Sequence, residues 1–550
     1  MYGYEYIAKM LHGYGVTHVF YTEAMLRMAI REMDKMGIRN IMAHSEAAAG
    51  YMADGYARAS GRPGICMSQS VGAANLAAAI GDAFMANCPV IALTGKKSPE
   101  YQYKNAYQEI DHRPLYDSVT KFNAELTDPA QLPFLLRHAF REVTTLKARP
   151  AHLDIPNLMG RTAELAEIKE EVFIEEMYTK YPAYRTPSEK GQVEKAAAAI
   201  DKAQKPIIVA GRGASVSGAG MALFSLAQRG DIPIVTSPDG KCLIDETDPL
   251  WGGIVGGYGM DCANRAAAKA DLVIFVGTQT SDQTTSEWRS PARGVQVIQI
   301  DVDPTELGKN YPGAIGLLGD ARTVAEQLTE AVSKKSRPEW RKEVAGYLKA
   351  TEDEYNAKKA EDGKPMRPER LCAELNNVLP SDAIVVADTG FSAVWSTTML
   401  RLKPTQSYYR AAGSLGWAFP AAMGAKCAAP ERPVICFSGD GAIYYHIAEM
   451  ETAVRKGIKT VTILNNNQAL GQCSGELKNI HKEKDDKGAD FFKFSPVDLS
   501  KVAAEFGAFV LRVEEPAQVG AAVKQALEQD KPALVEVITE NVPVPPSFKA

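Results

Sequence analysis

The sequence predicts an α/β protein of three domains, each built on a doubly wound, mostly parallel sheet. Short β-branched runs alternate along the chain with Ala-rich helical stretches and small-residue turns, which is typical of repeated strand–helix–strand units. Two polar, highly charged stretches interrupt this alternation. Because 550 residues are too many for a single hydrophobic core, we interpret the interruptions as domain boundaries.

The first predicted domain covers residues 1–165. Its expected strands are residues 17–20, 38–44, 64–69 and 89–95. Its expected helices are residues 46–60 and 73–87. The polar stretch that follows, residues 166–190, breaks the pattern, and we interpret it as a linker.

The second and third predicted domains cover residues 190–335 and 366–540. Expected strands of the second domain are 205–211, 232–237, 271–277 and 295–303. The densely charged stretch 336–368 between the domains suits a solvated helix and a connector. Expected strands of the third domain are 383–390, 432–438, 460–465 and 533–540.

Composition argues against several classes of protein. Hydrophobic residues make up 45% and charged residues 23% of the chain, which is ordinary for a globular protein. The net charge is −5, and Lys and Arg are scattered, so we expect no nucleic-acid binding. The chain has no leader-like start and no apolar run of bilayer length, so we expect a cytoplasmic protein without a membrane contact.

Polar residues follow two neighbouring strands of the third domain. Gly439, Asp440 and Gly441 come after the strand at 432–438, and Asn467 comes after the next one. Open α/β sheets bind ligands at this edge, and glycines let backbone N–H groups approach an anion. A carboxylate beside that anion would repel it unless a cation lay between them. We therefore expect Mg²⁺ to join Asp440 and Asn467 to a diphosphate, although Gly-Asp-Gly alone is more often only a turn.

The combined order of strand, Gly-Asp-Gly, helix, strand and Asn-Asn resembles the cofactor-binding motif of the thiamine-diphosphate-dependent decarboxylases and carboligases. Within that superfamily, the chain is similar to the acetolactate synthase-like enzymes of the large catalytic subunit type. The stretches that carry the wider resemblance are residues 44–68, 105–112, 300–310, 387–395 and 413–426. The resemblance implies a pyrimidine-binding domain, a middle domain and a diphosphate-binding domain, in that order.

The resemblance assigns Glu46 to the glutamate that activates the cofactor. Thiamine diphosphate is inert until the proton on thiazolium C2 leaves. In the family, a glutamate at N1′ drives the tautomerisation that turns the 4′-amino group into the base. Such an acid works best among apolar neighbours, which residues 47–52 could supply. Taken alone, a glutamate at a helix N-terminus is also explained by the helix dipole.

Two further catalytic candidates lie in one predicted loop. The resemblance places Gln108 near the reaction centre. His112 follows in the same stretch and is interpreted as a candidate proton shuttle, although a lone histidine is more often a hydrogen-bonded structural residue.

The remaining site positions are carried over from the family. The implied cofactor-binding residues are Glu46, Gly390, Phe391, Ser392, Gly413, Leu415, Asp440, Gly441, Ala442, Asn467 and Leu470. The implied metal ligands are Asp440, Asn467 and the carbonyl of Ala469. Leu415 matches the apolar residue that wedges under the cofactor, and Gly413 matches the residue whose carbonyl accepts from its 4′-amino group. Phe391 and Ser392 replace the Gln-His of the acetolactate synthases, so only backbone contacts and the serine hydroxyl carry over there.

The resemblance implies a thiamine-diphosphate- and Mg²⁺-dependent enzyme that makes or breaks a C–C bond next to a carbonyl. The favoured activity is an acetolactate synthase-like carboligase acting on a 2-oxo acid. Three alternatives stay open: a non-oxidative 2-oxo acid decarboxylase, a lyase of the 2-hydroxyacyl-CoA or oxalyl-CoA type that takes an acyl thioester, and a sulfoacetaldehyde acetyltransferase-like enzyme. An inactive binding protein is disfavoured, because Glu46, Asp440 and Asn467 are all retained.

The resemblance also implies an oligomer. In the family, the pyrimidine end of the cofactor sits on one subunit and the diphosphate end on the other, so we expect at least a homodimer and favour a homotetramer. The middle domain of relatives holds FAD, ADP or nothing. Residues 277–285 lack the Arg- and Asp-rich run of the FAD binders, so we expect no tightly bound FAD.

Overall fold

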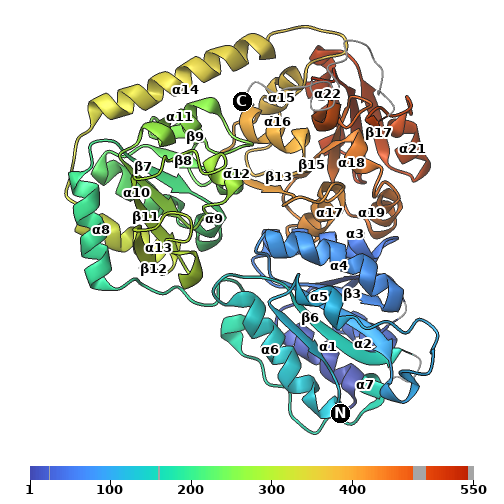
Figure 1. The fold of residues 1–550 in the computed structure, drawn as a ribbon. Helices are drawn as coiled ribbons and strands as arrows, with labels where there is room; N and C mark the ends of the chain where they lie inside the picture. The colour runs from blue at the N-terminus through green and yellow to red at the C-terminus, as the bar shows by residue number, and fades with distance from the viewer. Residues whose placement is uncertain (24, 159–161, 475–490, 543–550) are drawn as a thin grey trace.

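The structure, a computed structural model, describes residues 1–23, 25–158, 162–474 and 491–542. It contains three six-stranded sheets flanked by helices (Figure 1). Every pairing between the described strands of these sheets is parallel. The predicted fold class is therefore confirmed. Each sheet lies within one of the three predicted domain ranges, whose boundaries stay a prediction.

The N-terminal sheet has the strand order β2-β1-β3-β4-β6-β5. Its strands are β1 (His18–Tyr21), β2 (Arg39–Met42), β3 (Gly64–Gln69), β4 (Val90–Lys97), β5 (Phe122–Glu125) and β6 (Ala151–Leu158). Its helices are α1 (Gly3–Gly13), α2 (Arg27–Lys35), α3 (Glu46–Ser60), α4 (Ser70–Met85), α5 (Arg113–Asp117), α6 (Leu132–Thr144) and α7 (Thr162–Leu165). β5 and β6 were not predicted from the sequence. In β6 the polar residues His152 and Asp154 are buried, so this strand lacks a continuous apolar run.

The middle sheet has the strand order β12-β11-β10-β7-β8-β9. Its strands are β7 (Pro206–Ala210), β8 (Ile234–Thr236), β9 (Trp251–Ile254), β10 (Leu272–Val276), β11 (Gln296–Asp301) and β12 (Ile315–Leu318). Its helices are α8 (Lys190–Lys202), α9 (Arg212–Ser217), α10 (Gly220–Gly230), α11 (Asp261–Lys269), α12 (Asp282–Thr285) and α13 (Ala321–Ala331). The order turns back at β7, as expected for a doubly wound sheet.

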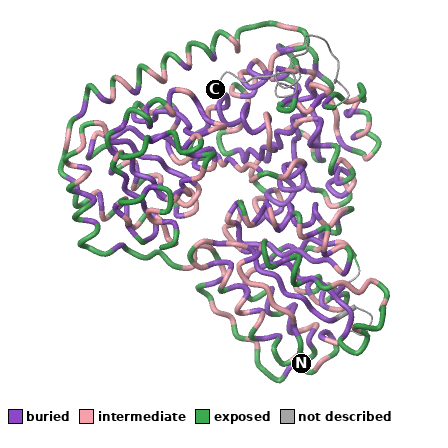
Figure 2. The backbone as a smooth tube through the Cα atoms, viewed as in Figure 1, coloured by how far each residue is buried: buried purple, intermediate pink, exposed green. Residues whose placement is uncertain are grey.

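The helix α14 (Pro338–Lys359) runs along the outside of the molecule from the middle domain to the C-terminal domain (Figure 1). It occupies the charged stretch that was predicted to form a solvated helix. Most of its residues are exposed or half-buried (Figure 2), and only Trp340, Val344, Thr351 and Tyr355 are buried. None of the helices that the structure describes combines the length and the apolarity of a membrane span.

The C-terminal sheet has the strand order β14-β13-β15-β16-β18-β17. Its strands are β13 (Ile384–Ala387), β14 (Ser407–Arg410), β15 (Val434–Gly439), β16 (Val461–Asn466), β17 (Phe509–Val513) and β18 (Ala533–Ile538). Its helices are α15 (Pro368–Asn376), α16 (Phe391–Met399), α17 (Ala418–Ala428), α18 (Asp440–Ile443), α19 (Glu449–Lys456), α21 (Leu499–Glu505) and α22 (Pro516–Leu527). The carboxyl ends of β13, β15 and β16 therefore lie side by side.

The N-terminal and C-terminal domains meet where α3 packs against α17, and one buried hydrophobic cluster continues across this boundary (Figures 1 and 2). Two glycines make the approach possible. A Cβ atom on Gly55 would lie 2.0 Å from the carbonyl oxygen of Ala421. A Cβ atom on Gly424 would lie 1.8 Å from the carbonyl oxygen of Met52. Neither helix could carry a side chain at these positions without moving away from the other.

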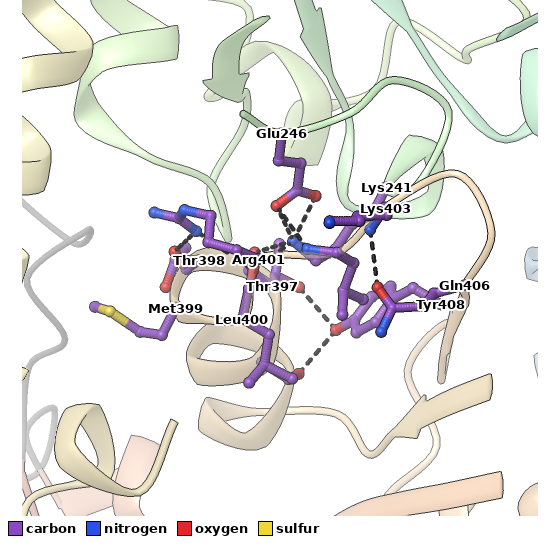
Figure 3. A network of polar contacts seen from close by, with 12 residues as sticks. Lys241, Glu246, Thr397, Thr398, Met399, Leu400, Arg401, Lys403, Gln406 and Tyr408 are labelled. Carbon is purple, nitrogen blue, oxygen red and sulfur yellow. Dashed lines mark hydrogen bonds and ion pairs between the residues drawn. The ribbon is translucent and has the colours of Figure 1, made fainter. Parts of the chain in front are cut away.

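A buried lysine joins the middle domain to the C-terminal domain (Figure 3). Lys241 Nζ donates to the carboxylate of Glu246 at 2.7 Å and to the carbonyl oxygens of Thr397 and Leu400 at 3.0 and 2.9 Å. Both carbonyls lie at the carboxyl end of α16. Lys241 thus pairs with a carboxylate and also satisfies carbonyl groups that have no partner within the helix. These contacts fix the carboxyl end of α16.

We predict that Gly424→Ala destabilises the protein by about 1–3 kcal/mol, because the added methyl group meets a backbone carbonyl that cannot turn aside. Thermal or urea unfolding measures the effect. The matched control is Gly346→Ala in α14, where an added Cβ atom meets nothing within 4 Å. This variant should be more stable than the parent protein by about 0.5–1 kcal/mol, because alanine has the higher helix propensity. Equal stability of the Gly424 variant and the parent protein would contradict the close packing of α3 and α17.

Candidate active site

A cavity of about 450 Å³ opens at the carboxyl ends of β13, β15 and β16. All the C-terminal residues predicted to bind the cofactor or the metal line this one cavity. They are Gly390, Phe391, Ser392, Gly413, Leu415, Asp440, Gly441, Ala442, Asn467, Ala469 and Leu470. Tyr258 and Gln283 of the middle domain and Arg410 complete part of its wall, and the sequence analysis did not single them out.

Asp440 begins the short helix α18, directly after β15 ends at Gly439. Its side chain is nearly fully buried, and among the described residues its Oδ2 atom has no hydrogen-bond partner. Burial raises the pKa of Asp440 to about 7, against the opposing effect of nearby backbone N–H groups. A buried carboxylate oxygen without a partner is costly in a protein interior, and a cation would supply the partner.

Gly441 keeps the space beside Asp440 open. A Cβ atom at this position would lie 2.7 Å from Leu470 Cδ2. A residue with a side chain would therefore push the Leu470 side chain aside. The glycine leaves a backbone N–H accessible at the start of α18, as a phosphate-binding turn requires.

Asn467 follows β16 and reaches the same cavity. Its Oδ1 atom accepts a hydrogen bond from the N–H of Ala469 at 3.1 Å, which fixes the turn. The preceding Asn466 is committed elsewhere, because its Nδ2 atom donates to Glu536 at 2.7 Å. Asp440, Asn467 and the Ala469 carbonyl thus offer a carboxylate, an amide oxygen and a peptide oxygen, which are the ligand types that Mg²⁺ prefers.

Gly390 leads into the nine-residue helix α16 with φ +64°, a conformation that favours glycine. Phe391 and Ser392 form the first turn of that helix, where backbone N–H groups have no helical partner. An anion at this end would meet both the free N–H groups and the positive end of the helix dipole. The cavity therefore combines a helix end suited to an anion with a set of oxygens suited to a cation.

The segment that carries Gly413 and Leu415 is fixed by a buried aspartate, Asp388, which was not among the site residues predicted from the sequence. Asp388 follows β13 and accepts from the N–H groups of Gly416 and Ala418 at 3.0 and 2.9 Å. Burial raises the pKa of Asp388 to about 6, and these hydrogen bonds oppose that rise. The only sequence signal for Asp388 is an acidic residue directly after an apolar strand.

Glu46 begins α3 in the N-terminal domain and is half-buried. Its carboxylate accepts from the Thr22 hydroxyl at 3.2 Å and from Asn75 Nδ2 at 2.8 Å. Gly72 gives it room, because a Cβ atom there would lie 2.7 Å from Glu46 Oε1. No residue of the N-terminal domain is among the described residues that line the cavity, so the structure does not bring Glu46 to the cavity of its own chain.

Gln108 and His112 lie in the loop between β4 and α5. Gln108 is half-buried and has a left-handed backbone with φ +61°. The ring of His112 is fully buried, with Nδ1 3.0 Å from Asp154 Oδ1 and Nε2 3.1 Å from the Ser70 carbonyl oxygen. Both ring nitrogens of His112 thus have partners within this chain, and these contacts hold the loop in place. A role for His112 as a proton shuttle stays a prediction.

Three family models match the chain. They are the N-terminal TPP binding domain, the central domain and the C-terminal TPP binding domain of thiamine pyrophosphate enzymes, at residues 1–115, 193–328 and 388–537.

Curated proteins match the chain over most of its length. The chain is 31% identical to the probable acetolactate synthase large subunit of Methanocaldococcus jannaschii, over 98% of this chain and 92% of the relative. It is 29% identical to the acetolactate synthase large subunit of Corynebacterium glutamicum, over 93% of this chain and 82% of the relative. It is also 29% identical to the acetolactate synthase isozyme 1 large subunit of Escherichia coli, over 91% of this chain and 87% of the relative. The chain therefore belongs to the thiamine pyrophosphate enzymes and is acetolactate synthase-like over nearly its whole length.

Proposed function

We propose that the protein is a Mg²⁺-dependent, acetolactate synthase-like carboligase that acts on a 2-oxo acid. The observation that carries the proposal is the cavity at β13, β15 and β16, where an unpartnered carboxylate oxygen of Asp440 lies beside an anion-binding helix end. Relatives named as acetolactate synthase large subunits favour a carboligase over the decarboxylase and lyase alternatives.

The residues of the cavity fit thiamine diphosphate and Mg²⁺. Asp440, the Asn467 side chain and the Ala469 carbonyl would hold the metal ion. A cation beside Asp440 would offset the cost of ionising a carboxyl group whose pKa burial raises to about 7. Backbone N–H groups near Gly390 and Gly441 would donate hydrogen bonds to the diphosphate oxygens, since neither glycine has a side chain that would block their approach.

Thiamine diphosphate, when bound, would supply a thiazolium C2 carbon that is nucleophilic once its proton has left, and a ring that can accept the electron pair released when a 2-oxo acid loses CO₂. The protein's own residues would prepare this carbon. Glu46, held by Thr22 and Asn75, would keep a proton at N1′ of the pyrimidine ring. Leu415 would pack under the cofactor, and the Gly413 carbonyl would accept a hydrogen bond from the 4′-amino group.

We infer that a second copy of the chain completes each site. Glu46 would need to contact the cofactor, yet no residue of the N-terminal domain is among the described residues that line the cavity of the same chain. A homodimer in which the N-terminal domain of one chain covers the cavity of the other removes this difficulty, and we favour a dimer of such dimers. We also propose that the enzyme acts in the cytoplasm and holds no tightly bound FAD, because residues 277–285 lack the charged run of the FAD binders.

We predict that Asp440→Ala abolishes the binding of thiamine diphosphate in the presence of Mg²⁺, as measured by titration calorimetry. The variant loses the metal ligand, so the diphosphate is left without its counter-charge. The matched control is Asp382→Ala, an exposed aspartate before the amino end of β13, which should bind like the parent protein. Unchanged affinity of the Asp440 variant would contradict the assignment of the metal site.

We predict that Glu46→Gln binds the cofactor but activates it slowly. Glutamine keeps the shape and a hydrogen bond but cannot relay a proton, so deuterium exchange at cofactor C2 should fall by roughly 10²- to 10⁴-fold. Loss of a helix-terminal charge alone would cost about 0.3–1 kcal/mol of stability and leave the exchange rate unchanged. NMR follows the exchange without knowledge of the substrate. Glu505→Gln at an exposed position of α21 is the control.

We predict that two inactive variants complement each other. In a mixed dimer of Glu46→Gln and Asp440→Ala chains, one site carries both changes and the other carries neither. Random reassembly of a homodimer should therefore restore roughly a quarter of the parent C2 exchange. Light scattering should show at least two chains of 59.6 kDa each. An active monomer, or a mixture without any restored exchange, would show that each site belongs to one chain.

A further inference from the structure

One carboxylate of the N-terminal domain binds three consecutive amides of the cavity wall. Asp82 belongs to α4, a helix on the side of the N-terminal domain that faces the C-terminal domain (Figure 1). Its Oδ1 atom accepts from the N–H of Ala412 at 3.1 Å. Its Oδ2 atom accepts from the N–H groups of Gly413 and Ser414 at 3.0 and 2.7 Å. Three successive peptide units of one loop are thus oriented by a single side chain.

The environment of Asp82 suits a carboxylate, because it offers three N–H donors and a nearby guanidinium group. The residue is 4% exposed, so the group has left most of its hydration behind. The three amides replace that hydration, and Arg58 Nη2 lies 3.8 Å from Asp82 Oδ1 as a counter-charge. Hydrogen bonds from N–H groups to an ionised acceptor are stronger than those between neutral groups. The contact is therefore a rigid one between the two domains.

The third of these bonds sets the direction of a carbonyl. The N–H of Ser414 and the C=O of Gly413 belong to one planar trans peptide unit, in which they point in opposite directions. When Asp82 holds that N–H, the Gly413 carbonyl must point away from Asp82. Among the residues that the structure describes, none donates a hydrogen bond to this carbonyl. It is left as an open acceptor on a residue that lines the cavity.

We propose that Asp82 is a positioning residue that aims the Gly413 carbonyl at the 4′-amino group of the cofactor. This inference rests on the proposed function, because the role of the Gly413 carbonyl depends on the cofactor being thiamine diphosphate. Asp388 holds the same segment two residues further on, through Gly416 and Ala418. The stretch with Gly413 and Leu415 is thus held on both sides, from two different domains. Asp82 is not among the described residues that line the cavity, and it acts through the backbone of residues 412–414.

The test compares Asp82→Asn with the parent enzyme, loaded with Mg²⁺ and thiamine diphosphate. Asparagine has one acceptor oxygen instead of two, and its NH₂ group must face at least one backbone N–H. Calorimetry should give a cofactor dissociation constant within about tenfold of the parent value, because the metal ligands are intact. Deuterium exchange at C2 of the bound cofactor should slow by about 10²-fold, as expected when a reacting group loses its alignment. The control is Arg39→Ala, which removes another contact between the two domains, from Arg39 to the Lys456 carbonyl oxygen, and should match the parent in both measurements.

A second measurement keeps the proposal testable if Asp82→Asn does not fold. Hydrogen exchange of peptides that cover residues 411–415 should be slow in the parent enzyme without cofactor, because Asp82 holds these amides. Fast exchange there would overturn the proposal. So would an Asp82→Asn variant whose C2 exchange equals that of the parent, since a merely structural contact lowers the melting temperature without changing this rate. If the parent enzyme neither binds the cofactor nor exchanges C2, the proposed function itself fails and this inference fails with it.

Discussion

The close contact between α3 and α17 governs how the N-terminal and C-terminal domains meet. Gly55 and Gly424 have no side chains to hold the helices apart, so the backbones of α3 and α17 come into direct contact at these positions. This approach buries polar groups that must then find partners across it. Arg58 pairs with Asp54 of its own helix α3 at 2.7 Å. Across the boundary, Arg58 donates to the Arg410 carbonyl oxygen at 2.7 Å and stacks over the ring of Trp417, 4.4 Å from its centre. A buried pair of this kind is stable only while both charges keep their partners.

Buried carboxylates organise the two halves of the proposed site reciprocally. Asp82 of the N-terminal domain orients the C-terminal loop with Gly413. Glu449 of the C-terminal domain accepts from the N–H groups of His44 and Ser45, directly before Glu46, at 2.9 and 3.1 Å. Burial raises the pKa of Glu449, and the hydrogen bonds to it oppose that rise. Each domain therefore fixes the backbone beside a proposed cofactor contact of the other, and the boundary matters for both stability and function.

A buried network supports the loop with Gln108. The Thr94 hydroxyl lies 2.6 Å from His152 Nε2 and 2.8 Å from Asp154 Oδ1, and His112 bonds to the same carboxylate. Burial lowers the pKa of His152 to about 3, so that ring is neutral and serves as a hydrogen-bond partner. His112, four residues after Gln108, anchors one end of this loop to the network.

The sequence by itself determined the fold class, the order of the domains and which segments end at the same sheet edge. Alternating apolar strands and Ala-rich helices indicate which segments are buried, and parallel strands place their carboxyl ends together. Asp440 and Asn467 could therefore be assigned to one edge from strand order, whereas Gly390 was assigned through the family resemblance. The strands that were missed are mainly edge strands, such as β14 and β17, because a strand with one free edge needs no continuous apolar run.

Only the tertiary structure decided which polar groups meet across domains. Asp82 sits in an Ala-rich helix, 330 residues before the first amide that it binds, and no local pattern connects the two. That Glu46 serves a site on another chain was implied only by the family resemblance; no local pattern shows it, and the structure adds that no residue of the N-terminal domain lines the described cavity. The periodicity of apolar residues predicts whether a residue is buried. The partner of a buried charge depends on which distant segments of backbone come close to it, and this is known only once the chain has folded.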